Sequence, residues 1–140
     1  MKNISIVLAV FALVFTSVSC ETYDDYDADR APIIGFTQAN VNIKVREGST
    51  RDKSVDVYIS EAASVDRTFN VVVVADETEV AAENYSFTET VEILANERFG
   101  EVTITGIDVS LTEEKTPLTL QVQSGDGVIS GAKVTAELFK

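Results

Sequence analysis

Residues 54–59 read SVDVYI and show the pattern that decides the fold of this chain. Their apolar members, Val55, Val57 and Ile59, alternate with Ser54, Asp56 and Tyr58. Successive side chains of a strand point to opposite faces, so this alternation predicts a strand with one face buried and one face in water. The same pattern recurs in four other stretches, whose expected inward residues are Val41, Ile43 and Val45; Val102 and Ile104; Leu118, Leu120 and Val122; and Val134, Ala136 and Leu138.

Two further stretches complete the expected sheets. Residues 69–75, FNVVVVA, are apolar on both faces and predict the most central strand, and Val91 and Ile93 indicate one more short strand. Turn-forming residues rich in Gly, Asn, Pro and Ser separate the stretches. Seven strands without a long helical period predict an all-β fold, a single seven-stranded antiparallel sandwich of two sheets.

The alternation changes phase at Gly106. Val102 and Ile104 precede this glycine at even positions, whereas Ile107 and Val109 follow it at odd positions. One extra residue in a strand produces such a slip and leaves both pairs facing the core. The sequence therefore predicts a β-bulge at Gly106.

The N-terminal segment predicts an export signal. Residues 1–20 read MKNISIVLAVFALVFTSVSC, with Lys2 before a short apolar run and small residues before Cys20. We expect a signal peptide over 1–19, Cys20 with a flexible acidic tether over 20–31, and the sandwich over 32–140. Cys20 is the only cysteine of the chain, and a lipid on its thiol would protect it in an oxidising compartment. Ordinary signal cleavage, with no modification of Cys20, is the alternative.

Composition excludes several enzyme classes. The chain has no histidine and one cysteine, so neither Ser-His-Asp nor Cys-His catalysis nor a zinc site can form. No glycine-rich phosphate loop precedes a helix. The net charge of −12 opposes binding to nucleic acid and to anionic lipid head groups. We therefore expect a protein that is not an enzyme and needs no cofactor.

The N-terminal residues resemble a bacterial lipoprotein signal, with Ser17-Val18-Ser19-Cys20 in the lipobox position. The acidic stretch after the cysteine resembles the export tag of Bacteroidetes-type surface lipoproteins, and Glu21, Asp24 and Asp25 are the matching residues. This resemblance implies palmitate on Cys20 and an outer-membrane protein exposed at the cell surface.

The remainder of the chain resembles a Calx-beta domain, a family of immunoglobulin-like sandwiches. The matching positions are Glu83-Asn84-Tyr85, Ala95-Asn96-Glu97 and the strand from Val102 to Val109. The resemblance implies an immunoglobulin-like fold. It also implies weak calcium binding by loop carboxylates, and the matching residues are Asp76, Glu83, Asp108, Glu113 and Glu114. The chain departs from the family where an acidic doublet is usual, because Val109 follows Asp108.

Tyr58 is the candidate residue for glycan binding, since its alternation places it on the wet face of its strand. Cross-strand pairing without a ligand is the alternative role. Together these observations predict a lipid-anchored binding or structural module that is not an enzyme. Two alternatives remain open: a glycan-capturing accessory lipoprotein of a polysaccharide-uptake system, and an adhesion or assembly module whose edge strand pairs with a partner chain.

Overall fold

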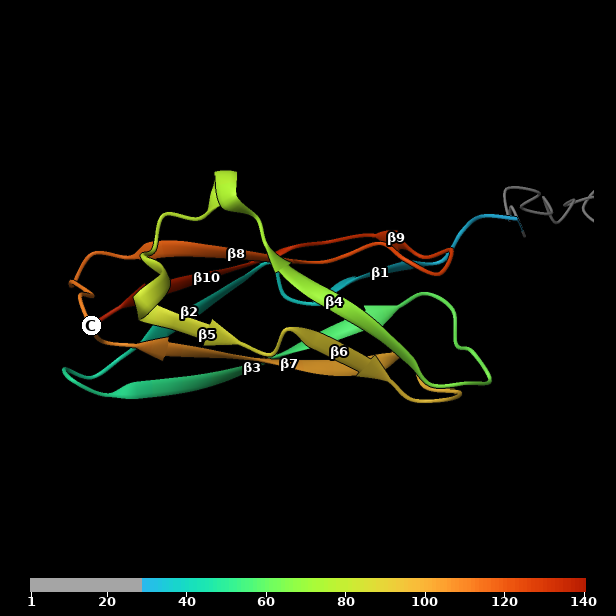
Figure 1. Cartoon of the computed structure of the whole chain (residues 1–140), viewed down its shortest axis with the longest axis horizontal. Coiled ribbons are helices and arrows are strands. Elements are labelled where there is room, and N and C mark those ends of the chain that lie inside the picture. Colours follow the sequence, from blue (N-terminus) through green and yellow to red (C-terminus); the bar gives the residue numbers. More distant parts are fainter. Residues whose placement is uncertain (1–28) are drawn as a thin grey trace, which may run out of the picture. The chain divides into compact units, whose positions relative to one another are not determined.

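A computed structural model describes residues 29–140, in which Ala31–Lys140 form one compact unit of two five-stranded β-sheets (Figure 1). The first sheet has the strand order β5-β7-β3-β1-β9, and the second has the order β2-β10-β8-β4-β6. The strands are β1 (Ile33–Phe36), β2 (Asn40–Lys44), β3 (Thr50–Ile59), β4 (Arg67–Val73), β5 (Tyr85–Phe87), β6 (Thr90–Ile93), β7 (Phe99–Ile107), β8 (Thr116–Val122), β9 (Ile129–Ser130) and β10 (Val134–Phe139).

The all-β sandwich is confirmed, but the expected seven strands are ten. The three additional strands, β1, β5 and β9, have only two to four residues each, too few to show an alternation in the sequence. The sheets are also not purely antiparallel, because β1 pairs with β9 and β2 pairs with β10 in parallel. Both parallel pairings join a strand near the start of the described sequence to a strand near its end. Local sequence patterns carry no information on such distant partners.

The predicted inward residues form the core. All fourteen residues assigned inward in the five alternating stretches are buried, as are Phe69, Val71, Val91 and Ile93 from the other two strands. Ile34 and Phe36 of β1 join them. Burial of these aliphatic side chains from both sheets is the main source of stability, because each contributes about 1.5–3 kcal/mol.

β4 is not the most central strand, as its apolar run predicted. It lies second from the edge of its sheet, and β8 and β3 occupy the two central places. The run is apolar on both faces for another reason. β6 pairs with β4 only as far as Asn70, and Val71, Val72 and Val73 beyond it line a surface opening with Phe87.

The predicted bulge at Gly106 is wrong. β7 pairs with β3 without interruption from Phe99 to Ile107, and Gly106 stands opposite Arg51. Gly106 is itself the next inward residue after Val102 and Ile104, whereas Val109 lies beyond the strand and is exposed. A Cβ at Gly106 would lie 2.7 Å from Val45 Cγ2 and 2.9 Å from Ile43 Cγ2. Glycine is therefore needed because the opposite sheet approaches closely, and the backbone phase never changes.

The connection from β4 to β5 contains the only helical structure described within residues 29–140. It consists of two 3-10 turns, η1 (Ala75–Glu77) and η2 (Ala82–Asn84). Within this range no helix has the length and apolar character needed to cross a bilayer.

Candidate functional site

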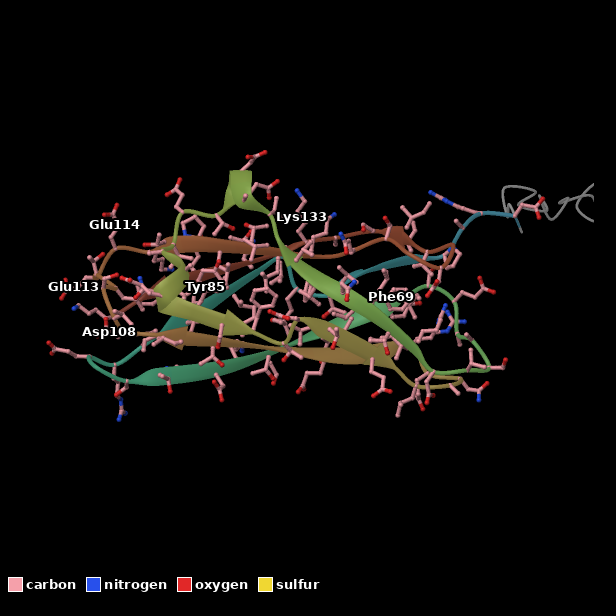
Figure 2. All side chains as sticks on the ribbon, in the orientation of Figure 1. Phe69, Tyr85, Asp108, Glu113, Glu114 and Lys133 are labelled. Carbon is pink, nitrogen blue, oxygen red and sulfur yellow. The ribbon has the colours of Figure 1, made fainter. Side chains whose placement is uncertain are left out.

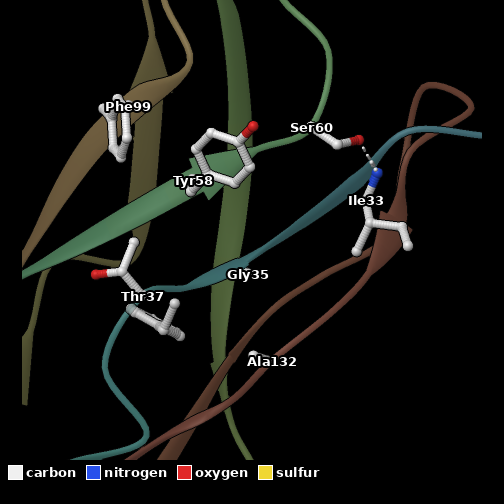
Figure 3. A pocket seen from close by; sticks show the side chains of 8 residues that line it. Ile33, Gly35, Thr37, Tyr58, Ser60, Phe99 and Ala132 are labelled. Carbon is white, nitrogen blue, oxygen red and sulfur yellow. Dashed lines mark hydrogen bonds between the residues drawn. The ribbon is translucent and has the colours of Figure 1, made fainter.

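An aromatic pocket lies on the outer face of the first sheet, where β1, β3 and β7 meet (Figure 3). Tyr58 and Phe99 stand directly opposite each other on β3 and β7, with ring centroids 5.2 Å apart and planes inclined by 53°. This tilted arrangement is a favoured geometry for an aromatic pair. Both rings remain open to solvent, with 37% of Tyr58 and 59% of Phe99 exposed.

Glycine and alanine make the space beside these rings. Gly35 of β1 pairs with Tyr58, and because Gly35 has no side chain it leaves the space of the pocket unfilled. A Cβ on Gly35 would lie 2.5 Å from the backbone nitrogen of Ala132, so no larger residue fits there. Ile33 forms the far wall, and the pocket has a volume of ≈ 380 Å³. That volume is within the usual range for sites of small molecules, about 300–1,000 Å³.

Polar groups surround the apolar floor. Arg98 donates from Nη1 to the backbone oxygen of Ser60 at 2.6 Å, and to the Tyr58 hydroxyl at 3.4 Å. The Ser60 hydroxyl accepts a bond from the Ile33 backbone nitrogen at 2.9 Å (Figure 3). Thr37 completes the lining on the opposite side. The guanidinium is thus held beside the rings, with nitrogen atoms to spare as donors to a ligand.

Hydroxyl groups are the reactive side-chain groups in the pocket lining. The lining includes three residues with a hydroxyl group, Thr37, Tyr58 and Ser60, and neither histidine nor a carboxylate among the residues that the structure describes. Asp56 and Glu101 stand opposite each other on β3 and β7, two residues along each strand from Tyr58 and Phe99. Neither carboxylate is part of the pocket lining. The arrangement can therefore hold the apolar face of a ligand and bond its polar groups, without activating a nucleophile.

Tyr58 lies on the wet face, as its alternation predicted, but Phe99 was not predicted. Phe99 precedes the alternating part of β7, in the segment Arg98-Phe99-Gly100, which shows no clear period. One signal could have found it. Extending the phase of Val102 and Ile104 backward places odd-numbered residues outward, so Phe99 is an outward aromatic residue on an otherwise polar face.

The opposite end of the sandwich contains most of the candidate calcium ligands, but the chain already uses two of them. Asp108 accepts the backbone N–H of Gly48 at 2.8 Å, and Glu83 accepts the Ser110 hydroxyl at 2.7 Å. Asn84, only 3% exposed, lies between them. Its Oδ1 accepts the backbone N–H of Val109 and of Ser110, and its Nδ2 donates to the Ser110 hydroxyl.

The other three candidate ligands do not complete a site. Glu113 and Glu114 lie in the loop between β7 and β8, near the same end as Asp108 (Figure 2). Asp76 lies in η1, on the separate connection between β4 and β5. Within residues 29–140 no three side chains of the metal-binding types come together. Calcium needs six to eight oxygen ligands, more than these separated carboxylates supply as they are placed here.

Four candidate residues lie outside the described part of the chain. They are Cys20, the expected lipidation site, and Glu21, Asp24 and Asp25 of the expected export tag.

Comparison with known proteins shows the fold. No family model and no curated protein matches the chain. Among solved structures, a protein of unknown function from Bacteroides ovatus is 17% identical with a TM-score of 0.59, covering 77% of this chain and 45% of that one. A multidomain protein including DUF1735 from Bacteroides ovatus is 16% identical with a TM-score of 0.56, covering 75% and 44%. The apo-form Calx CBD1 domain is 14% identical with a TM-score of 0.58, covering 79% and 100%.

These similarities support a Calx-beta-like β-sandwich, as the resemblance implied. The chain spans less than half of the length of the Bacteroides ovatus structures, and the whole of the Calx CBD1 domain corresponds to most of this chain. At such identities the likeness concerns the fold alone, and one sandwich fold supports many functions.

Proposed function

We propose that this chain is a non-catalytic binding module that captures a glycan in the aromatic pocket. In this proposal a lipid on Cys20 anchors the module at the outer membrane of a bacterium, with the sandwich exposed at the cell surface. The observation that carries the proposal is the pair of exposed rings, Tyr58 and Phe99, over an apolar floor with Arg98 beside them.

The chemistry of the pocket suits a sugar ring. A pyranose has an apolar face of C–H groups and a periphery of hydroxyl groups. The two rings and Ile33 offer apolar contact, while Arg98, Ser60 and Thr37 offer polar partners at the margin. Sites of this kind, apolar with a few placed polar groups, fix orientation as well as affinity. An open pocket whose lining has no carboxylate or histidine is suited to binding a glycan and not to cleaving it.

The geometry does not favour the alternative of an assembly module that pairs its edge strand with a partner. Strand addition needs a long edge free of charged residues. The outer strands are β5 and β9 in the first sheet, with three and two residues, and β2 and β6 in the second, with five and four. The longest of them, β2, ends in Lys44, and Lys115 donates to Asn42 at its middle.

The binding test uses a soluble form of the chain that begins at residue 21. Electrophoresis through gels containing soluble starch, mannan or xylan should retard the protein in at least one gel. Tyr58→Ala and Phe99→Ala should each weaken that retention at least tenfold, with unchanged circular dichroism. Val109→Ala is the matched control, because Val109 is about as exposed as Phe99 but lies outside the pocket. Migration unaffected by every glycan, or equal loss in the control, would contradict the proposal.

The anchor is tested separately in cells. Cys20→Ser should abolish the incorporation of labelled palmitate, which requires the cysteine thiol. Equal labelling of the wild type and the variant would eliminate the lipid anchor while leaving the glycan site standing.

A further inference from the structure

A second pocket, at the turn between β2 and β3, has the opposite chemistry to the first. Its lining consists of Lys44, Arg46, Ser49, Thr50 and Arg51, and its volume is ≈ 420 Å³. Three of these five side chains are cationic and two carry hydroxyls, and no carboxylate is among them. Such a lining is unexpected in a chain with a net charge of −12. Residues 44–53 alone contain four of the eleven basic residues.

Among the residues that the structure describes, no carboxylate forms an ion pair with the cations of this pocket. The one ion pair found within residues 29–140 joins Lys133, just before β10, to Glu77 of η1, and involves no residue of the pocket. The acidic residues near the turn are used elsewhere: Asp52 accepts the Thr105 hydroxyl at 2.7 Å, and Asp108 accepts the Gly48 backbone N–H. Glu47 lies at the exposed tip of the turn and does not line the pocket.

The backbone around the pocket is firmly held. The Ser49 N–H donates to the Arg46 oxygen at 3.0 Å, and Gly48 has φ = 65°, as the third position of a type II turn requires. Asp108 fixes this turn from β7 by accepting the Gly48 N–H and by donating its own N–H to Ser49. Arg51, which also lines the pocket, donates from Nη1 to the Lys44 oxygen at 3.2 Å and so links the start of β3 to the end of β2.

We propose that this pocket is a second site, independent of the glycan pocket, and that it binds the sulfate groups of an anionic polysaccharide. Guanidinium groups match the geometry of oxyanions, and a lysine adds a mobile positive charge. Ser49 and Thr50 supply neutral donors to the same group. The three cations are solvent-exposed, so an anionic ligand can reach them without displacing a carboxylate of the pocket lining.

The pocket is a small basic area on an acidic chain, and this favours a flexible anionic chain over a broad anionic surface. A duplex nucleic acid or an anionic membrane presents a broad negative surface that would also face the acidic remainder of the chain. A single flexible chain with spaced sulfates can place one group in the pocket and lead the rest into solvent, beyond a screening length of about 8 Å. The turn also lies at the opposite end of the sandwich from the start of β1 (Figure 1).

The test compares dextran sulfate with neutral dextran, using the soluble form that begins at residue 21. Dextran sulfate should bind and neutral dextran should not, and raising the salt concentration from 50 to 200 mM should weaken binding several-fold because counterions are displaced. The variant Lys44→Gln/Arg46→Gln should weaken binding at least tenfold. Vesicles containing phosphatidylglycerol should not bind.

A charge-matched control separates a built site from general attraction. Lys53→Gln/Lys140→Gln removes the same charge outside the pocket lining and should change affinity by less than threefold. Tyr58→Ala should leave dextran sulfate binding unchanged, which keeps this proposal distinct from the glycan pocket. The proposal is overturned if dextran sulfate does not bind, if the control variant loses as much affinity as the pocket variant, or if the vesicles bind equally well.

Discussion

The aromatic pocket and the end of the sandwich that carries Asp108 and Glu83, the carboxylate end, lie toward opposite ends of the β3–β7 pair. They differ in how many of their side chains already form hydrogen bonds within the chain. At the carboxylate end, Asp108 and Glu83 accept bonds from Gly48 and Ser110 and so fasten loops together. At the aromatic end, Tyr58 and Phe99 contact each other but keep much of their surface in water. A residue type that suits a ligand indicates a site only where the fold leaves that residue available.

β7 joins the two ends, and Gly106→Val should have the largest effect of any change on it. The new side chain would press on Val45 and Ile43, whose methyl groups already lie under 3 Å from the position of a Cβ. Overpacking of this kind costs typically 1–3 kcal/mol, and we expect about 3 kcal/mol here since both neighbours are fully buried. Urea unfolding of the variant measures the loss.

Thr103→Val on the same strand is the control for this change. Thr103 is on the outer face, where valine suits a strand equally well, so stability should stay within about 0.5 kcal/mol. Equal stability of the two variants would contradict the close approach of β2 to Gly106.

Asn84→Ala should have the next largest effect, because it loosens the carboxylate end. The substitution removes the acceptor of the Ser110 backbone N–H and one of the two acceptors of the Val109 N–H, whose other acceptor is the Ile107 oxygen. Such an unpaired donor costs about 1–3 kcal/mol, so we expect a loss of about 2 kcal/mol. Glu83→Gln keeps an oxygen that can accept the Ser110 hydroxyl, so this variant should lose far less stability. Thermal melts of both variants test this order.

Local sequence patterns predicted the local features of the fold and not the pairings between distant strands. Alternation identified the buried residues of five strands in advance, because burial of one face is a local property of a strand. It could not identify β9, which has two residues, or the parallel partners of β1 and β2. The prediction for Gly106 was wrong because the sequence does not distinguish a glycine at a β-bulge from a glycine that allows a neighbouring strand to pack closely.

The candidate sites divide in the same way. Tyr58 could be placed on the outer face from its neighbours alone, but its pairing with Phe99 depends on the register of β3 against β7. The acidic residues could be chosen by type and by resemblance, but their hydrogen-bond partners come from distant turns. Gly48 is bonded to Asp108, and nothing in the intervening sequence indicates that contact.

A smaller effect is expected beside the aromatic pocket, where Asp56 and Glu101 stand directly opposite each other. Like charges at such positions destabilise a sheet, and Glu101→Lys replaces the repulsion with attraction. We expect a gain of about 0.5 kcal/mol, reduced at high salt. Glu92→Lys makes the same change of charge opposite Thr68, and it should be neutral in the same urea titration. A gain shared by both variants would reflect net charge alone.

The smallest effect is expected from calcium. The described carboxylates do not converge, so millimolar calcium should raise the melting temperature no more than the same concentration of magnesium does. A site of the weak extracellular kind, with a Kd of about 0.1 mM, would add about 2.7 kcal/mol at 10 mM calcium. A calcium-specific rise of that size, lost in Glu113→Ala, would show that the carboxylate end assembles a site on binding.

The parallel pairings of the last strands have a consequence for how the domain is made. Ile129 pairs with Ile33 in one sheet, and Thr135 pairs with Asn40 in the other, so a single C-terminal segment completes both. β2 has no other partner within its sheet, because it is the outermost strand beside β10. Strands synthesised first must therefore wait for those synthesised last, and contacts so distant along the chain slow folding to about milliseconds or seconds. A chain that ends before Ile129 should neither close its sandwich nor resist proteolysis, however complete its first eight strands are.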